Sequence, residues 1–305
     1  MPELPDILLY MHALAPRVVG RRIDAIELGS PFLLRSVHPP LESAVGRAVV
    51  ALHRLGKRIA FELEGGLFLV FHLMIAGRFK WSGEKLPAER TRSPRSPALL
   101  AIRFEHGTLT LTEAGTVRRA LLHVVDGPAA LAAHDPGGLE VLDSDAAAFD
   151  RALRAANHTL KRALTDPRLF SGIGNAYSDE ILHAAQLSPF LMTQGLSAEE
   201  SRRLYEAARA TLRTWIDRLR EQAAGEFPSK VTAFHEEMAV HGRYGKPCPR
   251  CGSPVQRIVY AANEANYCAT CQTGGRLLAD RALSRLLRKD WPRTLEELER
   301  RRGRD

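Results

Sequence analysis

Two sets of residues in this chain have the types and spacing that chemistry requires, and the first is the start of the chain. Met1 is followed by Pro2 and Glu3. Removal of an initiator Met would leave Pro2 with a free secondary amine, and an α-amine with a pKa of ~8 is partly unprotonated at neutral pH. Such an amine can attack a sugar C1′ carbon and form an iminium, while Glu3 moves protons. The alternative is a stiff, frayed chain end.

The second set is a group of four cysteines arranged as two C-x2-C pairs. Cys248 and Cys251 are followed, after sixteen residues, by Cys268 and Cys271. Four thiolates at this spacing can surround one Zn²⁺, and because they fill all four positions the metal would be structural. Their confinement to one short window favours a metal in a reducing compartment over two disulfides. A zinc ribbon of this kind can bind DNA, RNA or protein.

The chain that must position these residues is basic. It has 305 residues, with 43 Lys and Arg against 35 Asp and Glu. This length allows two domains, and the formal charge of +8 favours a polyanionic partner, although many basic proteins bind none. The sequence contains no apolar run of membrane-spanning length and no signal-peptide pattern. It therefore predicts a cytoplasmic protein that is not exported and has no membrane partner.

The N-terminal half reads as one helix followed by short strands. A helix is expected over 8–19. The predicted strands, which are separated by Gly, Pro or charged turns, cover residues 23–28, 47–55, 58–63, 67–73, 98–104, 108–112 and 120–125. No alternation of strands with helices is present, which favours an antiparallel sandwich or barrel over a parallel sheet. The charged, proline-containing segment 84–97 is expected to be a surface loop.

Three segments of this half have residue types suited to DNA. Lys57 stands at the tip of the basic turn 54–58, where it could hold a phosphate or simply be solvated. Segment 71–78 places large apolar residues before a Gly turn, and they are either core or a wedge that fills a vacated base stack. Segment 116–119 is a second basic turn, which contains Arg118.

The middle of the chain turns helical after a predicted linker over 128–145. Lys161 lies in a helix that precedes the turn Gly172-Ile173-Gly174, and Asn175 begins the next helix. Free backbone N–H groups at a helix start attract anions, so this turn is a candidate phosphate site, with a plain Gly-rich connection as the alternative. A long amphipathic helix is expected over 196–220. Residues 276–305 are expected to add two helices separated by Pro292.

Together these motifs resemble the formamidopyrimidine-DNA glycosylase and endonuclease VIII family of base-excision repair enzymes, over roughly residues 1 to 275. The motifs are Pro2-Glu3-Leu4-Pro5, Gly56-Lys57, the segment Gly172 to Glu180, Gly242-Arg243-Tyr244-Gly245 before Cys248, and the ribbon that ends Tyr267-Cys268 to Cys271-Gln272. Five motifs in this order are highly specific.

The resemblance implies an α+β multidomain fold with DNA in a basic cleft. The implied parts are an N-terminal antiparallel β-sandwich catalytic domain (1–127), a linker (128–145), a helix-two-turn-helix DNA-binding domain (146–242), a zinc finger (243–275) and a C-terminal helical extension (276–305). The implied cofactor is one structural Zn²⁺ per chain. The implied partner is double-stranded DNA containing damaged bases or abasic sites, bound by a monomer.

The resemblance also implies a mechanism in which the damaged nucleotide is flipped out of the stack. Pro2 would form a Schiff base at C1′, Glu3 would manage protons as the sugar opens, and Lys57 would bind near the lesion. The strand would then be nicked by β- or β,δ-elimination. The implied DNA-binding residues are Lys161 and Asn175 on the backbone, Ile75 in the wedge, Arg118 in the second basic turn and Asn263 in the zinc hairpin.

Four positions depart from the family pattern. Asp6 replaces the usual Glu, Ile75 stands where Met is usual, and the loop 115–120 lacks the usual aromatic residue. Asn263 aligns with an Arg that grips phosphates, a charge-assisted contact of ~1.5–3 kcal/mol that Asn cannot replace. The sequence therefore predicts weaker or differently directed lesion binding. It leaves two alternatives: an enzyme for an unusual lesion or abasic site, and a non-catalytic zinc-dependent DNA-binding protein.

Overall fold

The computed structural model describes residues 1–83, 98–114, 117–228, 231–232, 234–260, 263–279 and 292–302. The predicted surface loop 84–97 lies outside these residues. The chain divides into two compact units. Unit 1 comprises Met1–Gly137 and Trp215–Ala233, and unit 2 comprises Gly138–Thr214 and Phe234–Asp305.

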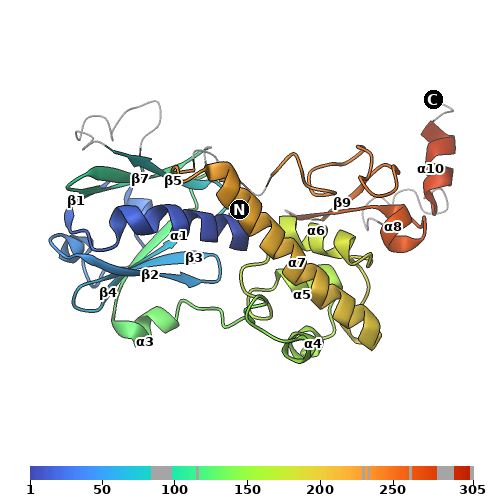
Figure 1. Ribbon diagram of the computed structural model, residues 1–305, viewed down its shortest axis with the longest axis horizontal. Helices are drawn as coiled ribbons and strands as arrows, with labels where there is room; N and C mark the ends of the chain where they lie inside the picture. The colour runs from blue at the N-terminus through green and yellow to red at the C-terminus, as the bar shows by residue number, and fades with distance from the viewer. Residues whose placement is uncertain are drawn as a thin grey trace. The chain divides into compact units, whose positions relative to one another are not determined.

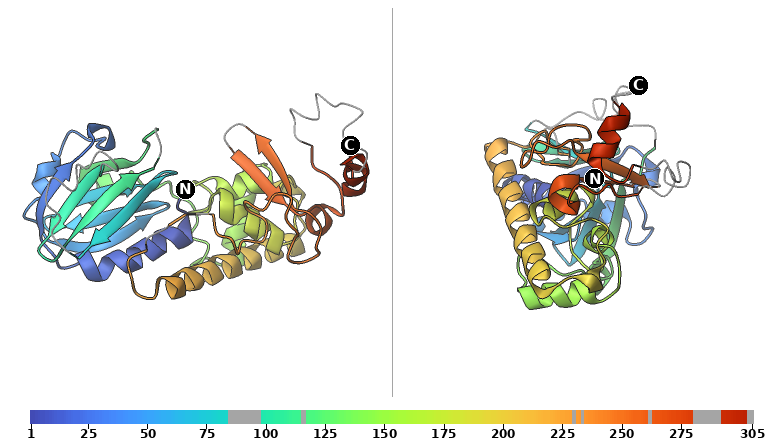
Figure 2. Two further views of the ribbon diagram at one scale, coloured as in Figure 1. Left: turned by 90° about the horizontal axis from the view of Figure 1, so that it is seen from above. Right: turned by 90° about the vertical axis from the view of Figure 1, so that its right-hand side faces the viewer.

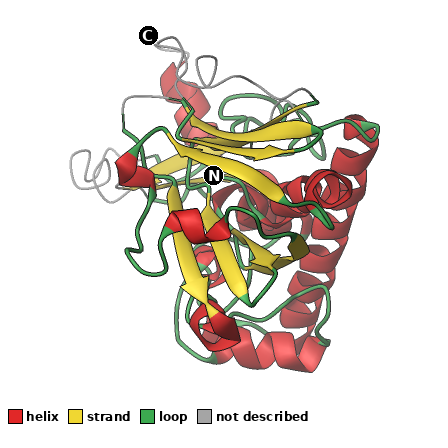
Figure 3. Ribbon diagram, turned by 90° about the vertical axis from the view of Figure 1, so that its left-hand side faces the viewer, coloured by secondary structure: helices red, strands yellow, loops and turns green. Residues whose placement is uncertain are grey.

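Unit 1 contains two four-stranded antiparallel sheets, which form separate layers in Figure 3. One sheet has the order β1 (Ile23–Leu28), β6 (Leu100–Phe104), β7 (Gly107–Glu113), β5 (Gly77–Ser82). The other has the order β2 (Val49–Leu55), β3 (Arg58–Leu63), β4 (Leu67–His72), β8 (Leu121–Asp126). Every pair is antiparallel, which confirms the predicted β architecture.

Aromatic residues from both sheets and from the first helix form the core of unit 1. Phe61 and Phe71 of one sheet lie 5.2 Å apart between ring centroids, and Phe71 meets Phe79 of the other sheet at 5.3 Å. Tyr10 of helix α1 (Leu4–Val18) packs edge-on against Phe79 at 5.5 Å. The helix also contacts β2 and β3 (Figure 1). Burial of these rings therefore fixes α1, and the chain start before it, on the sheets.

Two elements of unit 1 differ from the sequence prediction. Helix α1 begins at Leu4 rather than at residue 8, because Pro5 fits the first turn of a helix, where no N–H partner is needed. Strand β5 was not predicted. Its alternation of buried Phe79 with exposed Lys80 is typical of a strand, but it follows directly on the turn after β4, where Met74 has a φ of +53°.

Short helices complete unit 1. Two single turns of 3-10 helix span Pro31–Leu33 and Leu41–Ala44. Helix α3 (Gly127–Ala132) lies, apart from Gly127, within the predicted linker 128–145 and packs on β4 and β8.

Unit 2 is helical and carries a two-stranded hairpin. Its elements are α4 (Ala146–Arg154), α5 (Leu160–Thr165), α6 (Asn175–Ala184), a 3-10 turn (Thr193–Gly195), α8 (Ala269–Thr273), α10 (Leu295–Arg302), and the hairpin strands β9 (Gln256–Tyr260) and β10 (Asn263–Tyr267). Both β10 and α8 contact α6, as Figures 1 and 2 show. Helix α6 is therefore the element on which the hairpin rests.

The long helix α7 (Ala198–Ala223) contributes its residues up to Thr214 to unit 2 and the remainder to unit 1. A capping box begins this helix, which was predicted over 196–220: Glu200 N donates to Ser197 Oγ at 3.1 Å, and Ser197 N donates to Glu200 Oε2 at 2.8 Å. Although α7 has 26 residues, it is strongly charged. None of the described helices combines the length and the apolar composition that a bilayer crossing requires.

The C-terminal extension packs on the hairpin. Leu277 joins Ile258 and Tyr267 in a buried cluster, against which Leu295 and Leu298 also pack. The backbone N–H of Leu278 donates to Tyr267 Oη at 2.9 Å. Most of the first helix expected in this extension falls on residues 280–291, which lie outside the described residues. The second is confirmed as α10.

Candidate active site and four-cysteine cluster

The first residues of the chain are held in place by a reciprocal capping box. Glu3 is the N-cap of α1, and its backbone N–H donates to Asp6 Oδ2 at 2.8 Å, while its carboxylate accepts the backbone N–H of Asp6. Glu3 is 2 % exposed and Asp6 0 % exposed, and Pro2 is also buried. The shorter Asp6 therefore closes the box in place of the usual Glu, and the start of the chain is not a frayed end.

Two basic residues, Arg78 and Lys57, act electrostatically on this chain start. Burial lowers the pKa of the α-amine of Met1, the charge of Glu3 raises it, and the charges of Arg78 and Lys57 lower it, with a net decrease. The predicted residues Glu3 and Lys57 therefore lie within electrostatic reach of the terminal amine. Arg78 on β5 belongs to the same group and was not predicted. These surroundings favour an uncharged, nucleophilic amine at the start of the chain.

Lys57 occupies the tight turn between β2 and β3, where Gly56 has a φ of +60°. Next to this turn, Arg58 pairs in register with His72 on β4. Burial lowers the pKa of His72 to about 4, and the charges of Arg58 and Lys57 act in the same direction. His72 Nδ1 accepts the backbone N–H of Met74 at 3.1 Å, so the proton of the neutral ring is on Nε2. Sequence reasoning did not identify His72.

The depressed pKa of His72 predicts that the stability of unit 1 depends on pH. Above pH 6.5 the imidazole is neutral in both states. Between pH 6.5 and about 4 the unfolded chain binds more protons, so the free energy of unfolding falls as the pH falls. We expect His72→Gln, which has no such proton to bind, to lose less thermal stability than the parent between about pH 7.5 and about pH 5.5. Calorimetry of both proteins checks this, and equal losses would contradict it.

The turn after β4 presents an exposed apolar side chain. Ile75 is 56 % exposed, and the backbone carbonyls of Ile75 and Gly77 accept from Arg78 Nη1 at 3.1 and 2.7 Å. The turn is therefore braced while its tip stays in solvent. This geometry suits the wedge predicted for Ile75.

The second basic turn is held by one carboxylate. Glu113 accepts the backbone N–H groups of Arg119, at 2.8 and 2.9 Å, and of Ala120, at 3.1 Å. Arg118 is exposed beside them. Its side chain is thus presented on a fixed backbone, although residues 115–116 lie outside the described part of the chain.

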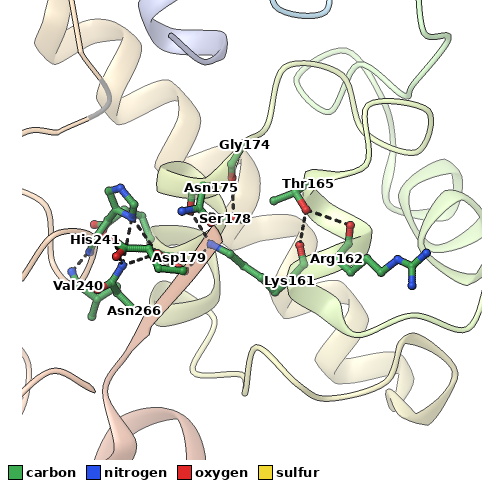
Figure 4. Close-up of polar contacts among 12 residues, drawn as sticks. Lys161, Arg162, Thr165, Gly174, Asn175, Ser178, Asp179, Val240, His241 and Asn266 are labelled. Atoms are coloured by element: carbon green, nitrogen blue, oxygen red, sulfur yellow. Dashed lines mark hydrogen bonds and ion pairs between the residues drawn. The ribbon is translucent and has the colours of Figure 1, made fainter. Parts of the chain in front are cut away.

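In unit 2 the structure brings Lys161 and Asn175 together, but not as two phosphate ligands (Figure 4). Lys161 is 1 % exposed, and its Nζ donates to the Asn175 carbonyl and to Asp179 Oδ1, both at 2.5 Å. This ammonium points into the unit, which differs from the predicted contact with the DNA backbone. Asn175 begins α6 after Gly174, where the free N–H groups of a helix start remain suited to an anion.

Two adjacent carboxylates on α6 bind the segment 239–241, which precedes the cysteines, and strand β10 of the hairpin. Asp179 Oδ2 accepts from His241 Nδ1 at 2.8 Å and from Asn266 Nδ2 at 3.1 Å. Glu180 accepts the backbone N–H groups of residues 239, 240 and 241 at 2.7 to 2.9 Å. Burial raises the pKa of Glu180, and these three hydrogen bonds oppose that rise. Neither acid was predicted to have a role, because these partners near the hairpin lie about 60 to 90 residues away in sequence.

The four cysteines form one cluster, with all Sγ atoms within 4.8 Å of one another. Cys248 and Cys271 are 4.0 Å apart between sulfurs, and Cys251 and Cys268 are 3.4 Å apart. Tetrahedral zinc with Zn–S bonds of ~2.3 Å needs S–S separations of ~3.8 Å. His183 Nε2 on α6 lies 3.2 Å from Cys248 Sγ. The cluster therefore fits a metal ion and rests against α6.

Three of these thiols have shifted pKa values before any metal is considered. Burial raises the pKa of Cys268 and raises that of Cys271 to about 11. Burial also opposes ionisation of Cys251, but hydrogen bonds from Ser253 lower its pKa to about 6. A bound dication would favour all four thiolates together.

Asn263 is the first residue of β10 and pairs with Tyr260 of β9. Its side chain lies outside the described part of the chain, as do residues 261–262. The predicted substitution of an Arg by Asn at the hairpin tip therefore stays a sequence-based prediction.

Three family models match consecutive parts of the chain. The formamidopyrimidine-DNA glycosylase N-terminal domain matches residues 1–126, the formamidopyrimidine-DNA glycosylase H2TH domain matches 138–223, and the zinc finger found in FPG and IleRS matches 245–274. An antiparallel β unit and a helical unit with a four-cysteine hairpin, matched in this order, define a DNA glycosylase with a helix-two-turn-helix domain and a zinc finger.

Known proteins and solved structures are similar to this chain along nearly its whole length. The formamidopyrimidine-DNA glycosylase of Thermus thermophilus is 34% identical over 286 residues, covering 90% of this chain and 100% of that protein. The crystal structure of the MutM (Fpg) protein from Thermus thermophilus matches with a TM-score of 0.70 at 32% identity, over 89% of this chain and 98% of that one. Lactococcus lactis Fpg in complex with Fapy-dG-containing DNA matches with a TM-score of 0.76 at 25% identity, over 89% and 100%. This chain belongs to the formamidopyrimidine-DNA glycosylase family.

Proposed function

We propose that this DNA glycosylase of base-excision repair is also an abasic-site lyase that uses the Pro2 amine. The observation that carries the proposal is the fixed chain start, where a buried capping box orders Glu3 next to Pro2 and the charges of Lys57 and Arg78 reach the α-amine of the preceding residue, Met1. A nucleophile held in one position converts a bimolecular attack into an effectively unimolecular one. Cleavage of Met1 is required, because Pro2 is blocked while it is attached.

The chemistry starts from a damaged nucleotide flipped out of the duplex. The Pro2 nitrogen bonds to C1′ and gives up its proton, while the base leaves with the electron pair of the glycosidic bond and takes up a proton. Glu3 delivers a proton to the sugar ring oxygen, so the ring opens to an iminium at C1′. Loss of a C2′ proton then expels the 3′ phosphate by β-elimination, and water releases the enzyme. Lys57 stabilises phosphate charge near the lesion.

We assign the DNA contacts by exposure. The half-buried Lys57, the exposed Arg118 and the exposed wedge Ile75 come from unit 1. The helix start at Asn175 and the hairpin strand that begins with Asn263 come from unit 2. Lys161 supports Asn175 from inside rather than touching phosphate. The partner is double-stranded DNA with damaged bases or abasic sites, bound by a monomer in the cytoplasm, where the nucleoid lies.

The four cysteines hold one structural Zn²⁺ in this proposal, supported by the sulfur spacing and by the matched zinc-finger family. The metal supplies hairpin stability rather than catalysis, because four thiolates leave no open coordination position. The corresponding domains are the catalytic β domain (1–127), a connection (128–145), the helix-two-turn-helix domain (146–242), the zinc finger (243–275) and the extension (276–305).

Borohydride trapping tests the proposal directly. Protein with a verified Pro2 terminus is incubated with duplexes that carry an abasic site or one of several oxidised bases. We expect a covalent protein–DNA band and base release, which together establish the iminium. Trapping at the abasic site alone would favour the second candidate, a lyase or unusual-lesion enzyme. The presence of Asn263 where the family has a phosphate-binding Arg supports that candidate. Binding without any trapping would overturn the lyase proposal and leave a non-catalytic DNA-binding protein.

Glu3→Gln should separate proton transfer from binding. The amide keeps the size of the side chain but cannot deliver a proton to the sugar ring oxygen as a carboxylic acid does, so we expect formation of the ring-opened iminium to slow by about 100-fold or more. DNA affinity should change far less. Single-turnover rates and binding titrations measure both, with the exposed Glu64→Gln as the matched control. A larger loss of affinity than of rate would contradict the role given to Glu3.

Asn263→Arg should restore a phosphate contact. We expect tighter binding to abasic-site DNA and a slope of log affinity against log salt that is steeper by about 0.9, the value for one phosphate. Titrations at several salt concentrations measure the slope. Asn263→Gln, which lengthens the side chain without charge, is the control. An unchanged slope would contradict the proposal that Asn263 stands where an Arg would contact a phosphate.

A further inference from the structure

Asp179 lies at the centre of the polar network in Figure 4, and its two carboxylate oxygens face two different elements. Oδ1 accepts from Lys161 Nζ, which also donates to the carbonyl of Asn175. Oδ2 accepts from His241 and from Asn266, which is on β10. One oxygen is therefore linked through Lys161 to the start of α6, and the other is hydrogen-bonded to the β9–β10 hairpin.

The network is fully removed from water, so its members depend on one another. The side chains of Asp179, Lys161 and His241 are 0 %, 2 % and 3 % exposed. A buried carboxylate needs its cation and its hydrogen-bond donors, and loss of either leaves an uncompensated charge. Asn in place of Asp179 would have an NH₂ group where one carboxylate oxygen now accepts hydrogen bonds, so that group would face other donors. The two sides of Asp179 therefore cannot relax independently.

Other residues of α6 extend the same arrangement. Ser178 Oγ donates to the carbonyl of Gly174 at 2.5 Å, which closes the helix start. Glu180 holds the backbone of residues 239–241, and His183 lies against Cys248. One helix thus contacts the candidate anion site at its beginning and the four-cysteine region along its length.

We propose that Asp179 is a positioning residue that couples the helix start at Asn175 to the β9–β10 hairpin. The two elements are then set relative to each other before DNA binds, which reduces the ordering cost of binding. This inference rests on the proposed function, in which both elements contact the DNA backbone. It also gives the buried Lys161 its role, which is to hold Asn175 through the network.

A double-mutant cycle between Lys161→Met and Asn266→Leu tests the coupling, because in the described contacts these residues are joined through Asp179 rather than to each other. DNA affinity is measured on a duplex with a stable abasic-site analogue, and amide hydrogen exchange is followed in both elements. We expect each single variant to weaken binding by roughly tenfold, and the double variant to be little weaker than the worse single variant.

Hydrogen exchange provides the readout that a merely local role would not change. Lys161→Met should accelerate exchange in β10, and Asn266→Leu should accelerate exchange at the start of α6. Effects confined to the mutated side, or affinity losses that multiply, would overturn the proposal. If Lys161→Met does not fold, the neutral change Asn266→Leu carries the same test alone.

The matched control is Asp150→Asn. This carboxylate also belongs to unit 2 and also binds an Arg and a Ser, namely Arg154 and Ser201, but it lies outside the network. The change should leave DNA affinity and exchange in β10 unaltered. The two proposals fail differently: if the parent protein does not bind the duplex, the proposed function fails, whereas additive effects in a binding-competent parent reject the coupling alone.

Discussion

Pro2→Gly should reduce borohydride trapping at an abasic site by about 100-fold. Glycine leaves a primary amine in place of the secondary amine, so a small residual signal is expected. It also removes the ring that fixes the backbone before Glu3, so the remaining amine is less well oriented. Trapping yields on matched duplexes, normalised to bound protein, measure the loss.

A protein in which the amine is blocked extends this test. Retention of Met1, or an uncleaved N-terminal tag, keeps the Pro2 ring but places its nitrogen in an amide, so trapping should disappear altogether. Pro31→Gly, the same change at an exposed position, should trap normally. Undiminished trapping by the blocked protein would show that another amine is the nucleophile and would remove Pro2 from the mechanism.

Cys268→Ser should release the metal and with it the hairpin. Structural zinc contributes ~10–16 kcal/mol in isolated zinc fingers, far more than the hairpin could supply from its own small core. Cys268 is 0 % exposed and packs with Val240 and Val255, so loss of the metal also loosens this cluster. We expect a zinc content near zero and a DNA affinity reduced by about 100-fold or more, because the hairpin contacts are lost.

Thr270→Ser is the control for this change, since Thr270 lies between Cys268 and Cys271 but is exposed. It should retain one zinc per chain and normal affinity. Metal analysis, DNA titration and the thermal transition of the β unit should be measured on the same samples. Retained zinc in Cys268→Ser, or unchanged affinity after zinc loss, would contradict the proposed function of the cluster.

The sequence was sufficient wherever a function depends on residues that are near one another in the chain. The spacing of the cysteines led to the correct cluster, because each C-x2-C pair is local and the hairpin between them is short. Strands β1 and β3 were predicted with their observed bounds, because alternation and turn residues are local signals. The start of the chain was also identified, although its capping box was not.

Tertiary structure decided which side chains face inward. Lys161 looks like a phosphate ligand in sequence, but it meets Asp179, 18 residues later, in the interior of unit 2. Asp179 in turn binds Asn266, 87 residues later. His72 and Arg78 gain their significance only because β4 and β5 place them near Lys57 and the chain start.

The C-terminal extension follows the same rule. Its apolar residues predicted helices, but not that Leu277, Leu295 and Leu298 would pack on the zinc hairpin. The sequence by itself thus determined the family, the four-cysteine cluster and the candidate nucleophile, because these depend on residue type and short spacing. Only the tertiary structure decided burial, charge pairing and the coupling through α6, because these depend on contacts between residues far apart in the chain.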